Sequence, residues 1–125
     1  MGSRKGSQLF DLEDRTFQFA KRVRVLIKMI SMTLWNREDA RQLLRASGSV
    51  GTNYIAANNA LGKKDFLMRI RICRKEARES GYWLNLIDLS STGTLGQERQ
   101  LLFEESQELM KIFGAILRNR TIKKS

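Results

Sequence analysis

The chain has 125 residues and a formal net charge of +10, with one cysteine, no histidine and no proline. This length indicates a single domain with one hydrophobic core. One cysteine cannot form an internal disulfide, and the absence of histidine removes the usual general base and the commonest metal ligand. These features argue against an enzyme, and we expect no catalytic residue, no metal site and no cofactor.

The ends of the chain carry no sign of secretion or membrane insertion. Residues 1–8 are small, polar and basic and are interpreted as a disordered leader, residues 9–120 as the folded body, and residues 121–125 as a basic tail. No apolar segment of a secretory signal follows the N-terminus. No apolar run approaches the ~20 residues that cross a bilayer. We therefore expect no membrane partner, and the single cysteine is consistent with a reducing compartment.

The first predicted helix runs from Asp11 to Leu34. Its apolar residues recur at alternating three- and four-residue steps, which is typical of a bundle seam. They are Leu12, Thr16, Phe19, Val23, Leu26 and Ile30, widened by Ala20, Ile27 and Leu34. The second helix is predicted from an Asn36 N-cap to Leu61. Its apolar face comprises Ala40, Leu43, Leu44, Val50, Tyr54 and Ile55.

The second helix contains two interior glycines, Gly48 and Gly51, in a run of small residues. Each glycine costs a helix about 1 kcal/mol relative to alanine. Either the helix breaks there, or the small residues admit another backbone. We favour close helix–helix approach at Gly51, because the apolar period stays in register across the run.

Two more helices complete the fold. The third is predicted over Lys64–Leu89, with a heptad seam of Phe66, Ile70, Cys73, Ala77, Ser80, Leu84 and Ile87. After a loop, Thr94 and Gln97 have capping-box spacing for the fourth helix, whose seam is Leu102, Leu109, Phe113 and Ile116. Four helices joined by short loops predict an all-α, antiparallel, up-down-up-down four-helix bundle.

Two helices carry basic faces with an aromatic residue alongside. They are Lys21, Arg24 and Lys28 with Phe17 on the first helix, and Arg71, Arg74, Lys75 and Arg78 with Tyr82 on the third. Such faces suit contacts to phosphates together with base stacking. The alternative is an ordinary solvated face, in which Lys75 pairs with Glu79 at i,i+4.

A second apolar strip lies beside the seam of the third helix: Met68, Ile72, Trp83 and Leu86. One four-helix core needs only one strip, and a large exposed apolar patch is unusual on a monomer. We therefore expect this strip to form an oligomer interface, unless neighbouring helices of the same bundle cover it.

Two segments resemble a known family. They are residues 45–57, RASGSVGTNYIAA, and residues 64–66, KDF, followed by residues 74–84, RKEARESGYWL. Together they are similar to the bacterial four-helix-bundle family named after proteins encoded in intervening sequences of 23S ribosomal RNA genes. This family is related to accessory proteins of diversity-generating retroelements. Asn53 and Tyr54 match the family pattern, whereas Ala56 stands where members usually carry Glu.

The resemblance implies a cytoplasmic, non-enzymatic homo-oligomer, a pentamer by analogy, with an RNA-related role. It also implies that Asn53 and Tyr54 form interhelical hydrogen bonds and packing contacts. Our first hypothesis is therefore an oligomeric RNA-binding protein that acts through the basic faces of its first and third helices. The alternative is a protein-interaction scaffold, such as an accessory subunit of a retroelement reverse transcriptase.

Overall fold

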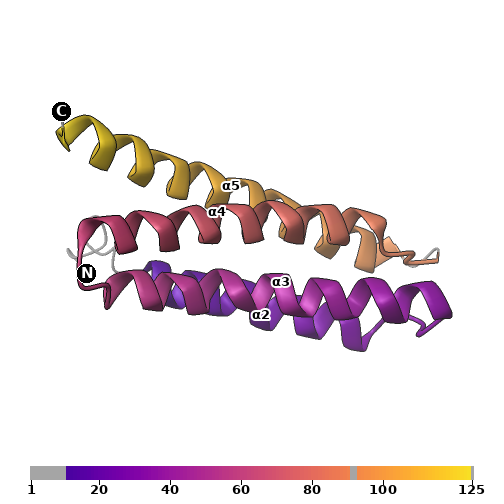
Figure 1. Ribbon diagram of the computed structural model, residues 1–125. Helices are drawn as coiled ribbons and strands as arrows, with labels where there is room; N and C mark the ends of the chain where they lie inside the picture. The colour runs from indigo at the N-terminus through magenta and orange to yellow at the C-terminus, as the bar shows by residue number, and fades with distance from the viewer. Residues whose placement is uncertain (1–10, 91–92, 125) are drawn as a thin grey trace.

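The computed structural model describes residues 11–90 and 93–124, and only the helical backbone of residues 120–124. Its four helices are α2 (Leu12–Lys28), α3 (Leu34–Asn58), α4 (Lys63–Leu86) and α5 (Gly93–Lys124). The described residues contain no β-strand, so the predicted all-α four-helix bundle is confirmed (Figure 1). The predicted leader, residues 1–8, lies outside the described residues.

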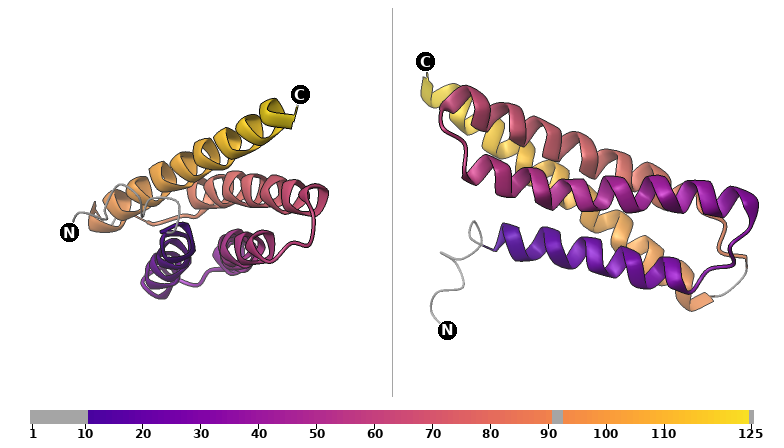
Figure 2. Two further views of the ribbon diagram at one scale, coloured as in Figure 1. Left: turned by 90° about the vertical axis from the view of Figure 1, so that its left-hand side faces the viewer. Right: turned by 60° about the horizontal axis from the view of Figure 1, so that its bottom comes forward.

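Each helix runs back along the one before it, as Figures 1 and 2 show. α4 packs closely against both α3 and α5, and α2 packs against α3. α2 makes few contacts with α5 and none with α4, so α2 and α4 lie on a diagonal of the bundle. α5 slopes away from α2 and α3 towards its C-terminus (Figure 2). Much of α5 is therefore supported mainly by α4.

The core follows the predicted apolar stripes. On α4, Ile70, Cys73, Ala77 and Leu84 are fully buried, whereas Phe66 at the start of the helix is partly buried. The predicted seams of α2 and α5 also reach the core, through Leu12, Phe19, Val23 and Leu26 and through Leu102, Leu109 and Phe113. The periodicity of the sequence thus predicts correctly which helix faces pack together.

The boundary between the first two helices differs from the prediction. α2 ends at Lys28 and α3 begins at Leu34, which is 81% exposed and does not extend the α2 stripe. Thr33 is the N-cap, because its hydroxyl accepts a hydrogen bond from the Asn36 backbone N–H at 3.1 Å. The predicted Asn36 N-cap is therefore wrong.

Asn36 instead joins two loops at one end of the bundle. Its buried side-chain amide donates to the carbonyl oxygens of Ser31 at 2.9 Å and Asp88 at 2.8 Å. Its side-chain oxygen accepts from the Asp88 backbone N–H at 3.0 Å. Asn36 thus satisfies backbone groups of both the α2–α3 and the α4–α5 connections, which a buried polar side chain has to do.

Two glycines mark close helix contacts. A Cβ built on Gly51 would lie 3.0 Å from Thr16 Oγ1 of α2, which confirms the predicted close approach there. A Cβ built on Gly48 would meet nothing within 4 Å, so of the two glycines in the run only Gly51 marks a close approach. Gly81 of α4 is tighter, with Ser106 Oγ of α5 at 2.8 Å. The sequence pattern does not predict this second contact.

Candidate nucleic-acid interface

Three arginines of α4 project from the bundle without ionic partners. Arg71, Arg74 and Arg78 are exposed, and none of them forms an ion pair or side-chain hydrogen bond with the described residues. They recur at steps of three and four residues, so their side chains share one face of the helix. We refer to Arg71, Arg74 and Arg78 as the arginine row.

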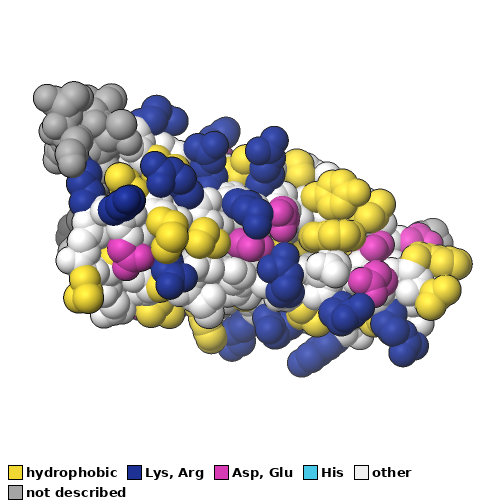
Figure 3. All heavy atoms as spheres, viewed as in Figure 1, with side chains coloured by type: hydrophobic (Ala, Val, Ile, Leu, Met, Phe, Trp, Pro, Cys, Tyr) yellow, Lys and Arg dark blue, Asp and Glu magenta, His cyan; other side chains and the backbone are white. Residues whose placement is uncertain are grey.

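The arginine row borders a hollow between α4 and α5. Its volume is about 240 Å³, and it is lined by the row together with Lys75 and Leu117. In Figure 3, Lys and Arg side chains gather over this part of the surface, where α5 runs beside α4. The sequence prediction that these four basic residues of α4 share one outer face is consistent with this placement.

A fifth basic residue, Arg118 of α5, reaches the same region. A Cβ built on Gly114 would lie 3.6 Å from Arg118 Nη1 and 3.9 Å from Arg74 Nη1. Gly114 therefore leaves room for guanidinium groups from two helices. The sequence analysis missed Arg118, because the pairing depends on how α5 lies against α4. An isolated glycine in the apolar pattern of α5, four residues before an arginine, is the signal that points to it.

The basic face of α2 is also exposed. Lys21, Arg24 and Lys28 form no ion pair in the described part of the chain, and Lys21 Nζ lies 5.7 Å from the centre of the Phe17 ring. Phe17 is 56% exposed. The cation–π contact between them occupies the ring that would otherwise be free to stack on a base.

The structure does not bring the two basic faces together. α2 and α4 lie on a diagonal of the bundle, and both faces point outwards. One subunit therefore presents two separate basic surfaces, and the α4 surface gains Arg118 from a neighbouring helix.

Two acidic residues of α5 pair with arginines of α2. Arg15 of α2 forms a two-pronged ion pair with Glu105 of α5, at 2.7 Å from Nε to Oε2 and 3.0 Å from Nη2 to Oε1. Arg22 pairs with Glu98 at 3.2 Å. These pairs help to hold α2 to α5, which otherwise make few contacts. Because structural pairs occupy these carboxylates, the outward-facing cations remain available to an external anion.

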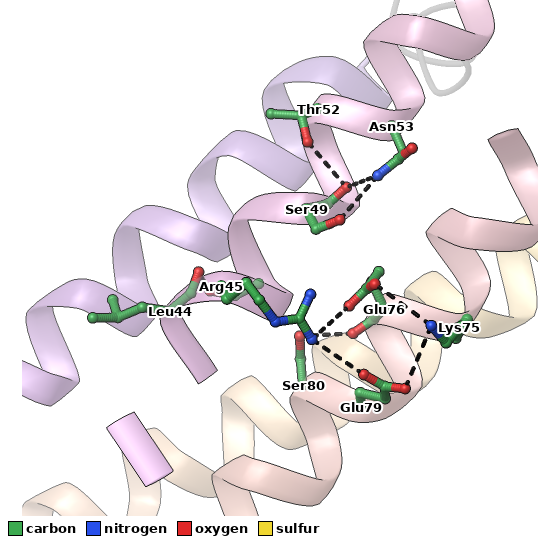
Figure 4. A network of polar contacts seen from close by, with 10 residues as sticks. Leu44, Arg45, Ser49, Thr52, Asn53, Lys75, Glu76, Glu79 and Ser80 are labelled. Atoms are coloured by element: carbon green, nitrogen blue, oxygen red, sulfur yellow. Dashed lines mark hydrogen bonds and ion pairs between the residues drawn. The ribbon is translucent and has the colours of Figure 1, made fainter. Parts of the chain in front are cut away.

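Lys75 belongs to a different arrangement from the arginine row. It lies 4.0 Å from Glu76 Oε2 and 3.9 Å from Glu79 Oε2, and Arg45 of α3 contacts the same two carboxylates at 3.4 and 3.3 Å (Figure 4). The i,i+4 pairing of Lys75 with Glu79, weighed from the sequence as the alternative, is thus present. Part of the Lys75 charge is balanced within the protein.

The predicted interface strip is divided. Met68 and Leu86 are exposed, at 43% and 49%, whereas Ile72 is half-buried and Trp83 packs partly against the bundle's own core. The ion-pair network of Glu76 and Glu79 lies between the first pair, Met68 and Ile72, and the second pair, Trp83 and Leu86. The four residues therefore form two short apolar patches along α4.

A further apolar surface, absent from the sequence analysis, lies at the α2–α3 junction. Met29, Met32, Leu34 and Trp35 are 62%, 45%, 81% and 59% exposed. They were missed because the predicted first helix ran through this junction and assigned Leu34 to the core. Ile55, also assigned to the core, is 47% exposed, and Ala57 occupies the buried position instead.

The residues that carried the family resemblance have structural roles. Asn53 of α3 accepts a hydrogen bond at 3.0 Å from Arg69 of α4, and the Tyr54 ring lies 6.0 Å from the Phe113 ring. The predicted hydrogen-bonding and packing roles of Asn53 and Tyr54 are therefore confirmed. Arg69 also lies 4.0 Å from Asp65, so this guanidinium has two partners although Ala56 supplies no carboxylate.

Other kinds of site find little support in the described residues. No group of three or more potential ligands gathers there as a metal ion would require. None of the helices in this part of the chain has both the length and the apolar character needed to cross a bilayer. Burial raises the pKa of the Cys73 thiol to about 12, which makes it a poor nucleophile.

Similarity to known proteins tests the family resemblance of the sequence. No family model matches the chain, and no curated protein matches it significantly. The fold matches the crystal structure of a protein of unknown function from the S23 ribosomal protein family of Bacteroides thetaiotaomicron VPI-5482. The two chains are 28% identical with a TM-score of 0.69, over 84% of this chain and 96% of that one. In fold and in sequence, therefore, this chain is similar to a member of the S23 ribosomal protein family, as its sequence segments predict.

Proposed function

We propose that this protein is a non-enzymatic, oligomeric nucleic-acid-binding protein whose α4 surface contacts RNA phosphates. The observation that carries the proposal is the arginine row: three exposed guanidinium groups on one helix face, without ionic partners in the described residues. Arginine suits this role because its planar fork of donors matches phosphate oxygens. The net charge of +10 adds long-range attraction for a polyanion.

The proposal assigns different weights to the two basic faces. Arg118 of α5 lies near Arg74 on the other side of Gly114, so it adds a guanidinium group from a second helix to the region beside the hollow. The α2 face is formed by Lys21, Arg24 and Lys28 of one helix. We therefore expect α4 to carry most of the affinity and α2 to provide a secondary contact.

Matched charge reversals test this proposal. One variant carries Arg71→Glu, Arg74→Glu and Arg78→Glu, and its control carries Lys21→Glu, Arg24→Glu and Lys28→Glu. Both change the net charge by the same amount, and both alter exposed residues only. We expect the α4 variant to bind a fluorescent 20-nucleotide RNA much more weakly than the wild type, measured by anisotropy. The α2 variant should retain most of it.

Salt dependence provides a second measurement. Each phosphate contact contributes roughly 0.7 to the slope of log affinity against log salt for a single strand. The wild type should show a steep slope and the α4 variant a slope shallower by about two units. Equal effects of the two charge reversals would indicate attraction by net charge alone and contradict a site on α4.

The alternative is the protein-interaction scaffold, such as a subunit that accompanies a reverse transcriptase. The observation that favours it is the exposed apolar surface at the α2–α3 junction, where Leu34 and Trp35 are 81% and 59% exposed. Under this alternative the α4 charge reversal leaves binding of the protein partner intact, whereas Leu34→Ser with Trp35→Ser abolishes that binding. RNA affinity that is unchanged in the α4 variant would favour the scaffold.

A further inference from the structure

The arginine row of α4 continues into an exposed aromatic residue. Tyr82 follows Arg78 by four residues and therefore lies on the same helix face. It is 61% exposed, and its ring lies 5.0 Å from the Trp83 ring at an interplanar angle of 84°. This contact with Trp83 helps to hold Tyr82 in place, and the exposure of Tyr82 leaves much of its surface open to solvent. In Figure 3 apolar side chains lie beside the basic area, over the C-terminal half of α4.

The arginine row and the Tyr82 ring are spaced so that one short RNA strand can contact all of them. From Arg71 to Tyr82 the helix rises about 16 Å, and each turn advances about 5.4 Å. Long arginine side chains at successive turns can thus contact successive phosphates. A base at the end of that strand then lies beside the Tyr82 ring.

The charge around Tyr82 does not oppose such a strand. The nearest acidic residue of α4 along the helix is Glu79, and its carboxylate is paired with Arg45 at 3.3 Å and with Lys75 at 3.9 Å. The pairing leaves little uncompensated negative charge between the arginine row and the ring. Tyr82 is therefore accessible to a nucleotide as well as exposed to water.

We infer that Tyr82 is a base-stacking residue and that the α4 surface prefers single-stranded to double-stranded RNA. This inference rests on the proposed function. In a duplex the bases are stacked on one another and their faces are closed to side chains, whereas a single strand presents each base face. The arginine row contacts the backbone of either form, so the preference comes from the ring.

The two aromatic residues beside the basic faces differ in how freely they can stack on a base. Phe17 of α2 lies beneath Lys21, at 5.7 Å from Nζ to the ring centre, whereas no cation of the described residues lies over Tyr82, whose ring is roughly perpendicular to that of Trp83. Both are similarly exposed, at 56% and 61%. Phe17 therefore supplies a matched control: an exposed aromatic beside a basic face that should not be the main stacking position.

The experiment compares two RNA probes on four proteins. The probes are a fluorescent 12-nucleotide oligouridine and a 12-base-pair RNA duplex, and the proteins are wild type, Tyr82→Leu, Tyr82→Phe and Phe17→Leu. Loss of one stacked base reduces affinity roughly 5- to 150-fold. We expect Tyr82→Leu to bind oligouridine about tenfold more weakly and the duplex unchanged. Tyr82→Phe, which keeps the ring, should bind both probes as wild type does, and so should Phe17→Leu.

The outcomes separate this inference from the proposed function. If Tyr82→Leu matches wild type on oligouridine while the charge reversal of the arginine row abolishes binding, the stacking role is wrong and the RNA surface stands. Equal weakening on both probes would also overturn the stacking role. If wild type binds neither probe, both proposals fail. Circular dichroism of Tyr82→Leu confirms that the helices remain.

Discussion

Gly81 of α4 and Ser106 of α5 mark a close approach of the two helices. A Cβ on Gly81 would lie 2.8 Å from Ser106 Oγ and 3.3 Å from the Phe103 ring. Ser106 Oγ donates to the Phe103 carbonyl at 2.6 Å, so its hydroxyl turns back onto its own helix. Because α5 contacts α2 only weakly, this junction helps to determine how α5 lies against the rest of the bundle.

We therefore expect Gly81→Ala to destabilise the protein. Alanine favours a helix by about 1 kcal/mol over glycine, but the clash with Ser106 should cost about 1–3 kcal/mol. Urea denaturation measures the net change. Ser106→Gly in the Gly81→Ala background should restore stability, because it removes the atom that the new methyl meets. If Gly81→Ala is more stable than wild type, the helices separate without penalty and the junction is not tight.

Gly51 and Gly48 make a matched pair on α3. Gly51→Leu should lower the free energy of unfolding by about 1–3 kcal/mol, because its side chain meets Thr16 across the α2–α3 contact. Gly48→Ala should raise it by up to about 1 kcal/mol, because nothing lies within 4 Å and helix propensity improves. Thermal unfolding of both variants decides the matter. A Gly51→Leu midpoint equal to that of wild type would contradict the close contact.

Gly51 and Gly81 also show how much of the packing can be predicted from the sequence alone. The apolar period of α3 continues through Gly51, which indicates an unbroken helix and hence a purpose for the glycine. Gly81 lies between the polar residues 78–80 and the apolar residues 82–84, and its contact depends on the rotation and crossing of α5. Local periodicity contains no information on that crossing. The close approach at Gly51 was therefore predictable, and the one at Gly81 was not.

The helix boundaries likewise depend on contacts that the local sequence does not reveal. The stripe of α2 can be read past Lys28 because no proline or glycine interrupts it. α2 ends before this point because Thr33 caps the start of α3 through the Asn36 backbone N–H, and because the Asn36 side chain forms hydrogen bonds to Ser31 and Asp88. The Asp88 contact spans 52 positions of the chain. The basic residues of α4 were found from spacing alone, but Arg118 required the packing of α5.

The buried carboxylate of Glu76 provides a test of the ion-pair network. The Glu76 side chain is 6% exposed, and Arg45 lies 3.4 Å from its Oε1, which accepts no hydrogen bond within the described structure. Arg45→Ala should destabilise the fold by about 1–3 kcal/mol, because it leaves a buried charge with weaker compensation. Adding Glu76→Gln should recover part of the loss. A double variant less stable than Arg45→Ala would show that this pairing does not matter.

Cys73 should be chemically silent in the folded protein. Burial raises the pKa of its thiol to about 12, whereas an exposed cysteine ionises near 8.5. Ellman's reagent at pH 8 should therefore react only after urea is added. Above about pH 8.5 the unfolded chain releases the thiol proton before the folded chain does, so stability falls as pH rises. Cys73→Ala should remove that part of the decline. Fast labelling of native protein would contradict this burial.

The last prediction concerns assembly, which the family resemblance implies. Met68 and Leu86 expose apolar surface on α4, but the network of Glu76 and Glu79 separates them. If both patches contact a neighbouring subunit, identical contacts repeated around an axis close a ring, and several arginine rows then bind one RNA with avidity. Light scattering at micromolar concentration should give a mass several times the 14.4 kDa of one chain.

Interface variants then locate the contact. Met68→Glu with Leu86→Glu should reduce the assembly to single chains, because two charges would be buried without partners. Leu61→Glu is the control, since Leu61 is fully exposed in the α3–α4 connection. Trp83 is less suitable for this purpose, because it also packs against the core and its loss affects folding. Dissociation by Leu34→Glu with Trp35→Glu instead would place the interface at the α2–α3 junction. A strictly monomeric wild type would refute the ring, and the arginine row would then bind RNA one subunit at a time.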